Sequence, residues 1–231
     1  VTVTDNGPGP EADDTLIRVV AHNRGPEPAV LHVLPHVWFR NTWSWKPSQP
    51  RPQLRQSSTQ SNRIELQHPT LVDFVFETEG APPFWFTENE TNTRRLYGQE
   101  SAAGHFKDAF HERLIHGRSD ATNPAGLGTK ACAHIVLSIP ARGSMTLRFR
   151  LARRSLPSLA DGFARFDALM GEREQEADTF YAALQQGIAD ADQRRVHRQA
   201  LAGMLWSKQF FRYNVRDWLS GDPLQIAPPP E

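Results

Sequence analysis

The sequence contains a single cysteine, Cys132, and lacks any long apolar run. One cysteine cannot form an internal disulfide, nor can it supply a cluster of thiolate ligands to a metal ion. No stretch approaches the ~18 consecutive apolar residues of a membrane-spanning helix. The first residues, "VTVTDNGPGP", do not read as a secretory signal and do not include an initiating Met. We therefore expect a cytoplasmic location and a chain that begins inside a longer protein.

An excess of either charge is also missing, because 26 basic residues balance 26 acidic ones. There is no run of five or six like charges, so charge suggests neither a nucleic-acid partner nor a membrane surface. At 39% hydrophobic and 23% charged residues, a chain of 231 residues can bury a proper core. The composition predicts a folded protein, and nothing in it indicates a metal or a cofactor.

Residues 15 to 151 carry the patterns of short β-strands. The segments "TLIRVVAHN" and "AVLHVLPHVWF", separated by "RGPEP", predict one hairpin, and "ACAHIVLSI" with "SMTLRFRL", joined by "PARG", predicts another. In the last segment Met145, Leu147, Phe149 and Leu151 alternate with Thr146, Arg148 and Arg150. This period of two is typical of an antiparallel strand with one solvated face.

Residues 158 to about 219 carry helical patterns instead. Apolar residues between 163 and 184 recur at steps of three and four, and Ser158 with Asp161 could form an approximate capping box. The next segment, about 29 residues from 191, is apolar on most sides from Leu201 onward, as in a helix packed inside a larger helical body. We predict a mainly β fold with C-terminal helices: a β-domain over 1–155, a linker helix over 156–188, and a truncated helical domain over 189–231.

Two polar segments are candidates for binding. "FTENETNTRRLYG" supplies Asn89, Glu90 and Asn92, whose side chains suit either sugar hydroxyls or hydrogen bonds to the loop's own backbone. "KDAFHERLIHG" supplies Lys107, Asp108 and His111, with no activated Ser or Cys patterned beside them. Among 26 acidic residues, proximity alone singles out no catalytic pair, so none is assigned.

Histidines and tryptophans crowd the segment from 32 to 45. His32 and His36 would lie roughly 13 Å apart on a strand, too far to share one metal ion. Within "HVWFRNTWSW", Trp43 and Trp45 share a face if the backbone is extended. That face could stack on a pyranose or pack against a neighbouring helical domain, and we favour the packing interpretation.

Several long blocks in order resemble bacterial members of glycoside hydrolase family 63, relatives of processing α-glucosidases and mannosylglycerate hydrolases. They include "LHVLPHVWFRNTWSW", "FTENETNTRRLYG", "KDAFHERLIHGR" and "RQALAGMLWSKQFFRYNVRDWLSGDP". The resemblance implies an antiparallel β-supersandwich, a connecting helical segment, and the first helices of an (α/α)6 barrel of the six-hairpin type. It also implies inverting hydrolysis by two carboxylates that would lie beyond Glu231, so no catalytic residue is carried over.

On this interpretation the chain is a non-catalytic scaffold that is inactive alone. Its partners are the parent protein's catalytic barrel and an oligosaccharide or glycoside substrate. Trp43, Trp45, Asn89, Glu90, Asn92, Lys107, Asp108 and His111 would lie at the active-site rim. A stand-alone carbohydrate-binding module and a mutarotase-like sugar enzyme are the alternatives.

Overall fold

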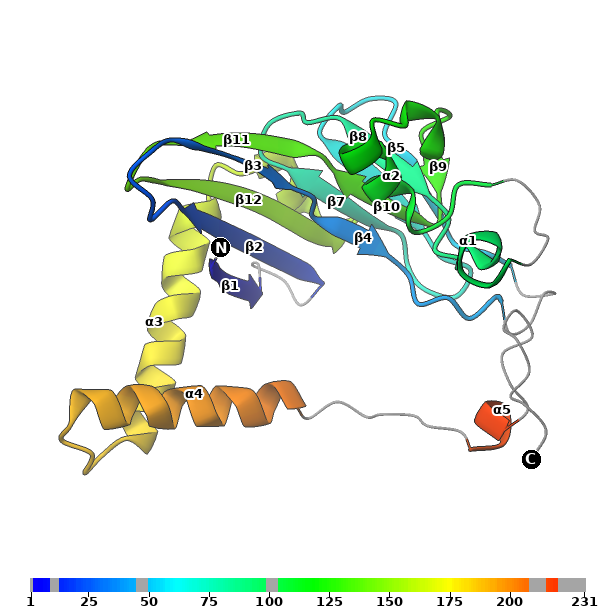
Figure 1. The fold of residues 1–231 in the computed structure, drawn as a ribbon. Helices are drawn as coiled ribbons and strands as arrows, with labels where there is room; N and C mark the ends of the chain where they lie inside the picture. The colour runs from blue at the N-terminus through cyan, green and yellow to red at the C-terminus, as the bar shows by residue number, and fades with distance from the viewer. Residues whose placement is uncertain (1, 9–12, 45–49, 99–103, 208–214, 220–231) are drawn as a thin grey trace.

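A computed structural model describes residues 2–8, 13–44, 50–98, 104–207 and 215–219 (Figure 1). Antiparallel strands form the body of the described chain up to Arg153, and the longer helices follow the last strand. The prediction of a mainly β fold with C-terminal helices is therefore confirmed at this level. None of the described helices combines the length and the hydropathy needed to cross a membrane.

The larger sheet has seven strands, ordered β1-β2-β12-β7-β6-β5-β9. Their bounds are β1 Thr2–Pro8, β2 Asp14–His22, β12 Ser144–Arg153, β7 Phe74–Thr78, β6 Arg63–Gln67, β5 Gln53–Gln56 and β9 Leu127–Gly128. Every neighbouring pair is antiparallel, and β12 has nine partners on β2.

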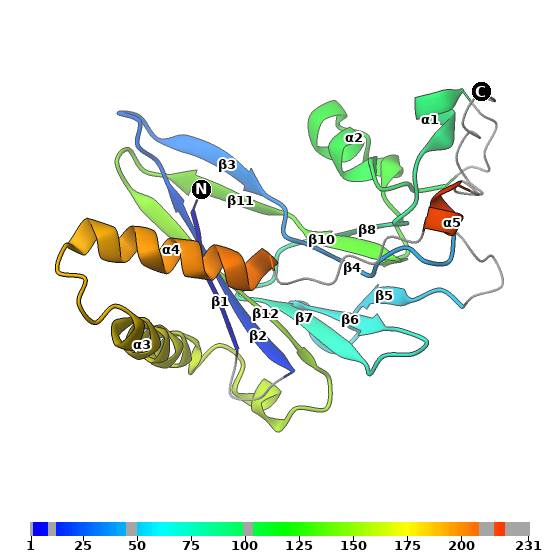
Figure 2. The same ribbon diagram turned by 90° about the horizontal axis from the view of Figure 1, so that it is seen from below.

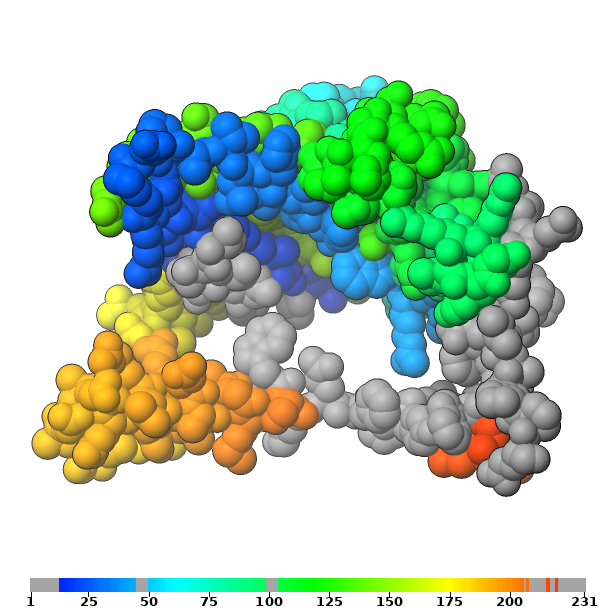
Figure 3. All heavy atoms as spheres, in the orientation of Figure 1, coloured from blue at the N-terminus to red at the C-terminus, as the bar shows by residue number. Residues whose placement is uncertain are grey.

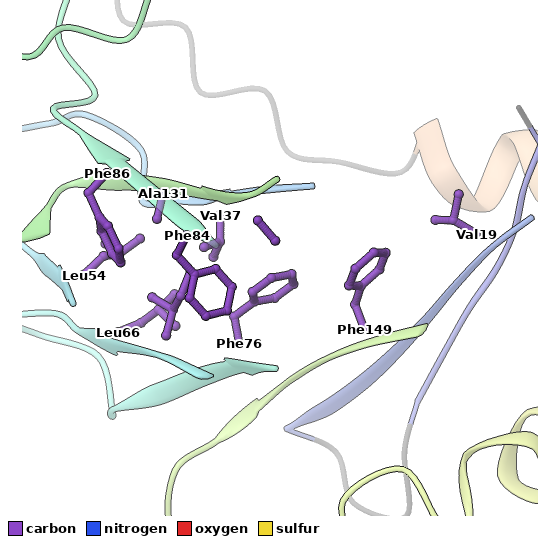
Figure 4. Packing of buried hydrophobic residues seen from close by; sticks show 11 residues of the cluster. Val19, Val37, Leu54, Leu66, Phe76, Phe84, Phe86, Ala131 and Phe149 are labelled. Carbon is purple, nitrogen blue, oxygen red and sulfur yellow. The ribbon is translucent and has the colours of Figure 1, made fainter. Parts of the chain in front are cut away.

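Two smaller sheets form a second layer against the larger one (Figures 1 and 2). One joins β4 (His36–Trp38), β10 (Lys130–Ala133) and β8 (Phe84–Thr87), and the other joins β11 (Ile135–Ile139) and β3 (Ala29–Val33). The main core lies between the layers (Figure 4). It combines Leu54, Phe76 and Phe149 of the larger sheet with Phe84 and Phe86 of the second layer.

Both predicted hairpins are wrong. Strand β2 pairs with β1 and β12 while β3 pairs with β11, and β12 pairs with β2 and β7 rather than with β11. The segments between them carry the chain from one layer to the other instead of turning within a sheet. The apolar faces are thereby buried against each other across the sandwich, which removes more apolar surface from water than a flat hairpin could.

The apolar side of β12 is confirmed at Leu147, Phe149 and Leu151, which pack in the main core, whereas Met145 near the start of the strand is 37% exposed. The opposite side differs from the prediction of a solvated face. Arg150 is 3% exposed, since the segment after the strand folds back over it. Its guanidinium forms a buried bidentate ion pair with Asp14 and donates to the carbonyl oxygens of Ser158 and Gly162.

The helical part begins with a short 3-10 turn, η2 (Pro157–Asp161), followed by α3 (Phe166–Leu184), α4 (Ala191–Ser207) and α5 (Val215–Leu219). The first turns of α3 pack on Leu16 of β2 through Phe166, Leu169 and Met170. Ser158 and Asp161 lie in η2, before α3, so they do not cap that helix. Of the predicted 29-residue helix, α4 and α5 are described, and the residues between them lie outside the described ranges.

Helix α4 lies apart from the sheets and crosses the far end of α3 (Figures 1 and 3). The two helices meet through Arg198, which pairs with Asp178 and stacks over the ring of Tyr181 at 4.7 Å. Val196, Met204 and Leu205 of α4 are 61%, 68% and 60% exposed. Leu201 is half-buried, and the predicted all-round burial of this helix is not reached in the described chain.

Candidate functional site

The loops that follow β8 gather the predicted site residues at one end of the second layer. Residues 88–92 lead into α1 (Thr93–Tyr97), and residues 104–108 lead into α2 (Ala109–His116), which is followed by the 3-10 turn η1 (Ser119–Ala121). The backbone N–H of Glu88 donates to the carbonyl of His105, and that of Lys107 donates to Glu90. Seven of the eight predicted residues belong to this region or contact it, and Trp45 lies outside the described residues.

Trp43 anchors the loop before β5 to this region. Its side chain is 3% exposed, and the indole Nε1–H donates to Oε1 of Glu90 at 2.9 Å. The same carboxylate oxygen accepts an ion pair from Arg51 at 3.0 Å. Because the ring is buried, Trp43 offers no face for stacking on a sugar, and the stacking alternative is wrong for this residue in the arrangement seen here.

Asn89 connects its loop to residues 39–41 and to Thr129. Its Nδ2 donates to the carbonyl of Phe39, and its carbonyl accepts from Nδ2 of Asn41. Its backbone N–H donates to Oγ1 of Thr129, whose hydroxyl donates to Glu88 at 2.7 Å. The side chain of Asn89 therefore bonds a backbone carbonyl, that of Phe39, which lies in another segment of the chain.

Gly128 allows this close approach between β9 and the end of β8. A Cβ at this position would lie 2.4 Å from the carbonyl oxygen of Thr87, far inside contact distance. The absence of a side chain therefore lets Thr129 reach the loop that carries Glu88 and Asn89. Thr87 in turn donates to the carbonyl of His105, which holds the second loop against the first.

Asn92 and Asp108 tie α1 to α2. Oδ1 of Asn92 accepts from the backbone N–H of Arg95 and caps α1, while its Nδ2 donates to Asp108 at 3.2 Å. Arg95 bridges Asp108 at 3.0 Å and Glu112 at 2.6 Å. The hydrogen bond that Arg95 donates to Asp108 is the largest cause that raises the pKa of Arg95.

The lysine and histidines of the second segment contact a hydroxyl, another imidazole ring and a backbone carbonyl. Lys107 is exposed and donates through Nζ to Oγ1 of Thr91 at 2.9 Å. The exposed ring of His111 contacts the ring of His116, with centroids 5.4 Å apart. Nδ1 of His105 lies within hydrogen-bond distance of the carbonyl oxygen of Ala121. The His111–carboxylate pair that a mutarotase-like mechanism needs is thus not among the contacts of the described residues.

A cationic and aromatic surface adjoins these loops at β4 and β10. Trp38 is 52% exposed, and Lys130 places Nζ 5.5 Å from its ring centroid and 5.6 Å from that of Phe110. Desolvation lowers the pKa of Lys130, and the charge of Lys107 lowers it further. Desolvation, with the charge of Lys130, lowers the pKa of His36 to about 4. An exposed indole beside a cation is a surface that a ligand or another domain could cover.

Glu88, Glu90, Asp108 and Glu112 are each engaged by a neighbour. Glu88 accepts from Thr129, Glu90 from Trp43, and Asp108 and Glu112 from Arg95. These contacts tie the loops to one another. Sequence reasoning missed Arg51, Thr129 and Asn41, which lie far from their partners along the chain.

His32 lies on β3 and His36 lies on β4, and the two rings contact different partners. The ring of His32 meets His134, and that of His36 meets Phe110. Within the described part of the chain, no group of three or more histidine, cysteine, aspartate or glutamate side chains is placed to hold a metal ion.

No family model matches the sequence. The chain is similar to the uncharacterized protein YMR196W of Saccharomyces cerevisiae, with 31% identity over 247 residues. The similarity covers 92% of this chain but 23% of that protein, so the chain spans about a quarter of the length of the relative it matches.

Proposed function

We propose that this chain is the non-catalytic, β-rich N-terminal part of a glycoside hydrolase. In this proposal the two layers belong to a β-supersandwich, α3 is the linker helix, and α4 begins an (α/α)6 barrel. The β-domain supports that barrel, and the loops around Glu90 and Asp108 lend their outer side to the rim of its active site. The parent enzyme would hydrolyse an α-glucosidic or related bond with inversion at the anomeric carbon. Both catalytic carboxylates would lie outside residues 1–231.

The observation that carries this proposal is the unpartnered apolar stripe of α4. Val196, Met204 and Leu205 lie on a helix that stands away from the sheets (Figure 3), and each is at least 60% exposed. A helix gains most of its stability from packing an apolar face, so a face left bare in water points to missing neighbours. The relative supports the same view, since three quarters of its length has no counterpart here.

The engaged carboxylates support the non-catalytic part of the proposal. Asp108 and Glu112 both pair with the guanidinium of Arg95, a contact that ties α1 to α2 and suits a structural role for the two carboxylates. We therefore expect the chain alone to show no turnover of aryl α-glucosides or disaccharides. A polypeptide that continues beyond residue 231 into the barrel should hydrolyse one of them.

Turnover by the chain alone that disappears in both Glu90→Gln and Asp108→Asn would overturn this proposal. Glu79→Gln provides the matched control, because Glu79 is an exposed carboxylate that pairs with Arg148. Activity that survives all three substitutions and still copurifies with the chain would also overturn it, whereas activity that further purification removes belongs to a contaminating enzyme.

A carbohydrate-binding module is the second candidate, and the exposed ring of Trp38 favours it. Apolar faces of pyranoses stack on such indoles, and Lys130 and Lys107 lie close by as hydrogen-bond donors. Calorimetry of the chain against glucose, maltose, mannose and glucosylglycerate tests it. A module should bind one of these sugars and lose binding in Trp38→Ala, whereas a scaffold without its barrel should bind none.

A further inference from the structure

Two histidines that are 102 residues apart in sequence meet on the second layer. His32 lies on β3, and His134 lies between β10 and β11. Nδ1 of His32 is 2.9 Å from Nε2 of His134, the ring planes agree within 3°, and the centroids are 5.2 Å apart. Parallel planes cannot then be separated by more than 2.9 Å, which is closer than two stacked rings can approach. The imidazoles therefore lie side by side, each pointing one nitrogen at the other.

The strands around the pair fix the backbone that carries each ring. Strand β3 pairs with β11 through five residues, from Ala29 to Val33, so the backbone carrying His32 is fixed relative to that following His134. The indole of Trp85 packs on the ring of His134, with centroids 4.2 Å apart. His32 itself is exposed, so the nitrogen pair can be reached from solvent.

The pair has the composition and the spacing of a two-ligand metal site. A tetrahedral ion bound at about 2.0–2.1 Å to two imidazole nitrogens places those nitrogens about 3.3 Å apart. The observed 2.9 Å must open by a few tenths of an ångström, and each ring must turn by about 35° in its plane so that the two lone pairs converge on a tetrahedral ion. Water would complete the coordination, because no third protein ligand gathers at the described residues.

An ion would take the place of the proton between the two facing nitrogens. A metal ion binds an imidazole nitrogen that carries no proton, so the N–H proton between the rings must leave that position when an ion enters. It can move to the outer nitrogen of its own ring or to solvent.

We propose that His32 and His134 form a binding site for a divalent transition-metal ion of the kind that prefers imidazole, with Cu²⁺ bound more tightly than Zn²⁺ or Ni²⁺. This order follows the general preference of nitrogen sites among these ions. Mg²⁺ and Ca²⁺ are not expected to bind, since they require oxygen ligands. The nearby guanidinium of Arg113 opposes a bound dication, so the site is weaker than one with three or four protein ligands.

Titration of the chain with Cu²⁺, followed by calorimetry and by electron paramagnetic resonance, tests the proposal. We expect one ion per chain and a spectrum with two coordinated imidazole nitrogens. His32→Ala should weaken binding at least about tenfold, because loss of a supporting contact alone costs a metal site 10–100-fold. The exposed position of His32 makes this substitution compatible with folding, which circular dichroism verifies.

His116→Ala is the matched control, since it removes an exposed histidine from the other close pair, His111 with His116. It should leave the affinity for Cu²⁺ and the two-nitrogen spectrum unchanged. The proposal fails if His32→Ala keeps the wild-type affinity for Cu²⁺, whether or not His116→Ala loses it. It also fails if the wild-type chain binds no ion, which would mean that the two rings only share a proton.

Discussion

Trp43 is the buried contact on which the geometry of the candidate rim depends most directly. Trp43→Phe removes the indole N–H that reaches Glu90 and leaves a small void, while Arg51 still faces the carboxylate. We expect the free energy of unfolding to fall by about 1–3 kcal/mol. Urea denaturation measures it, and Trp38→Phe should change it little because that ring is 52% exposed. Equal losses in the two variants would contradict the anchoring role.

His36 gives the protein a stability that depends on pH. Its pKa is lowered to about 4 in the folded chain, mainly by desolvation, from an ordinary value near 6.5. The unfolded chain therefore takes up a proton at His36 while the folded chain does not, so stability falls as the pH drops from 6.5 towards 4. Urea denaturation at pH 7 and pH 5 should show a smaller loss in His36→Gln than in the wild type. An identical loss in both would show that His36 is not responsible.

At the scale of elements, Arg150 fastens the helical part to the larger sheet. Its ion pair with Asp14 is almost fully buried, and the same guanidinium donates to the backbone oxygens of Ser158 within η2 and of Gly162 just after it. Arg150→Met leaves Asp14 as a buried unpaired charge, which should cost about 3–5 kcal/mol of stability in chemical denaturation. Arg153→Met, which breaks a half-exposed pair with Asp13, should cost at most about 1 kcal/mol.

A double variant separates the two contributions of this ion pair. Replacing Arg150 and Asp14 together by Met and Leu removes both charges, and much of the lost stability should return. If the double variant is as unstable as Arg150→Met alone, the loss comes from the contacts with η2 rather than from the unpaired carboxylate.

The same elements show what the sequence could predict about this fold. The strands β2 and β12 were predictable because alternation along one strand is a local property, and the apolar side of β12 is indeed buried. Their partners were not predictable, since pairing joins β3 to β11 across more than a hundred residues and no turn signal records it. The burial of Arg150 was hidden for the same reason, because its cover comes from a later segment.

The candidate site followed the same rule. Polar composition singled out Asn89, Glu90 and Asp108, and the fold does bring their loops together. The side chains that complete the network, Arg51 and Thr129, carry no local signal, and only the tertiary structure places them. His134 was likewise invisible as a partner of His32.

At the scale of the whole molecule, the bare face of α4 makes the chain prone to associate with itself. Met204 and Leu205 expose 68% and 60% of their surface, so they stabilise the isolated fold little and remain available to a second copy. Replacing both by Glu should lower self-association in sedimentation velocity while leaving the free energy of unfolding nearly unchanged. Gln193→Glu with Gln199→Glu adds the same charge at exposed positions of α4 and should leave the association as it is.

In a polypeptide that continues beyond residue 231, the same two Glu substitutions should destabilise the protein. There the proposed barrel covers α4, so burying two carboxylates at Met204 and Leu205 should lower the melting temperature and the hydrolytic activity together. The glutamine control should again change neither quantity. If the Glu variants stay as stable and active as the parent, α4 does not pack into a helical domain, and the exposed stripe must belong to another partner.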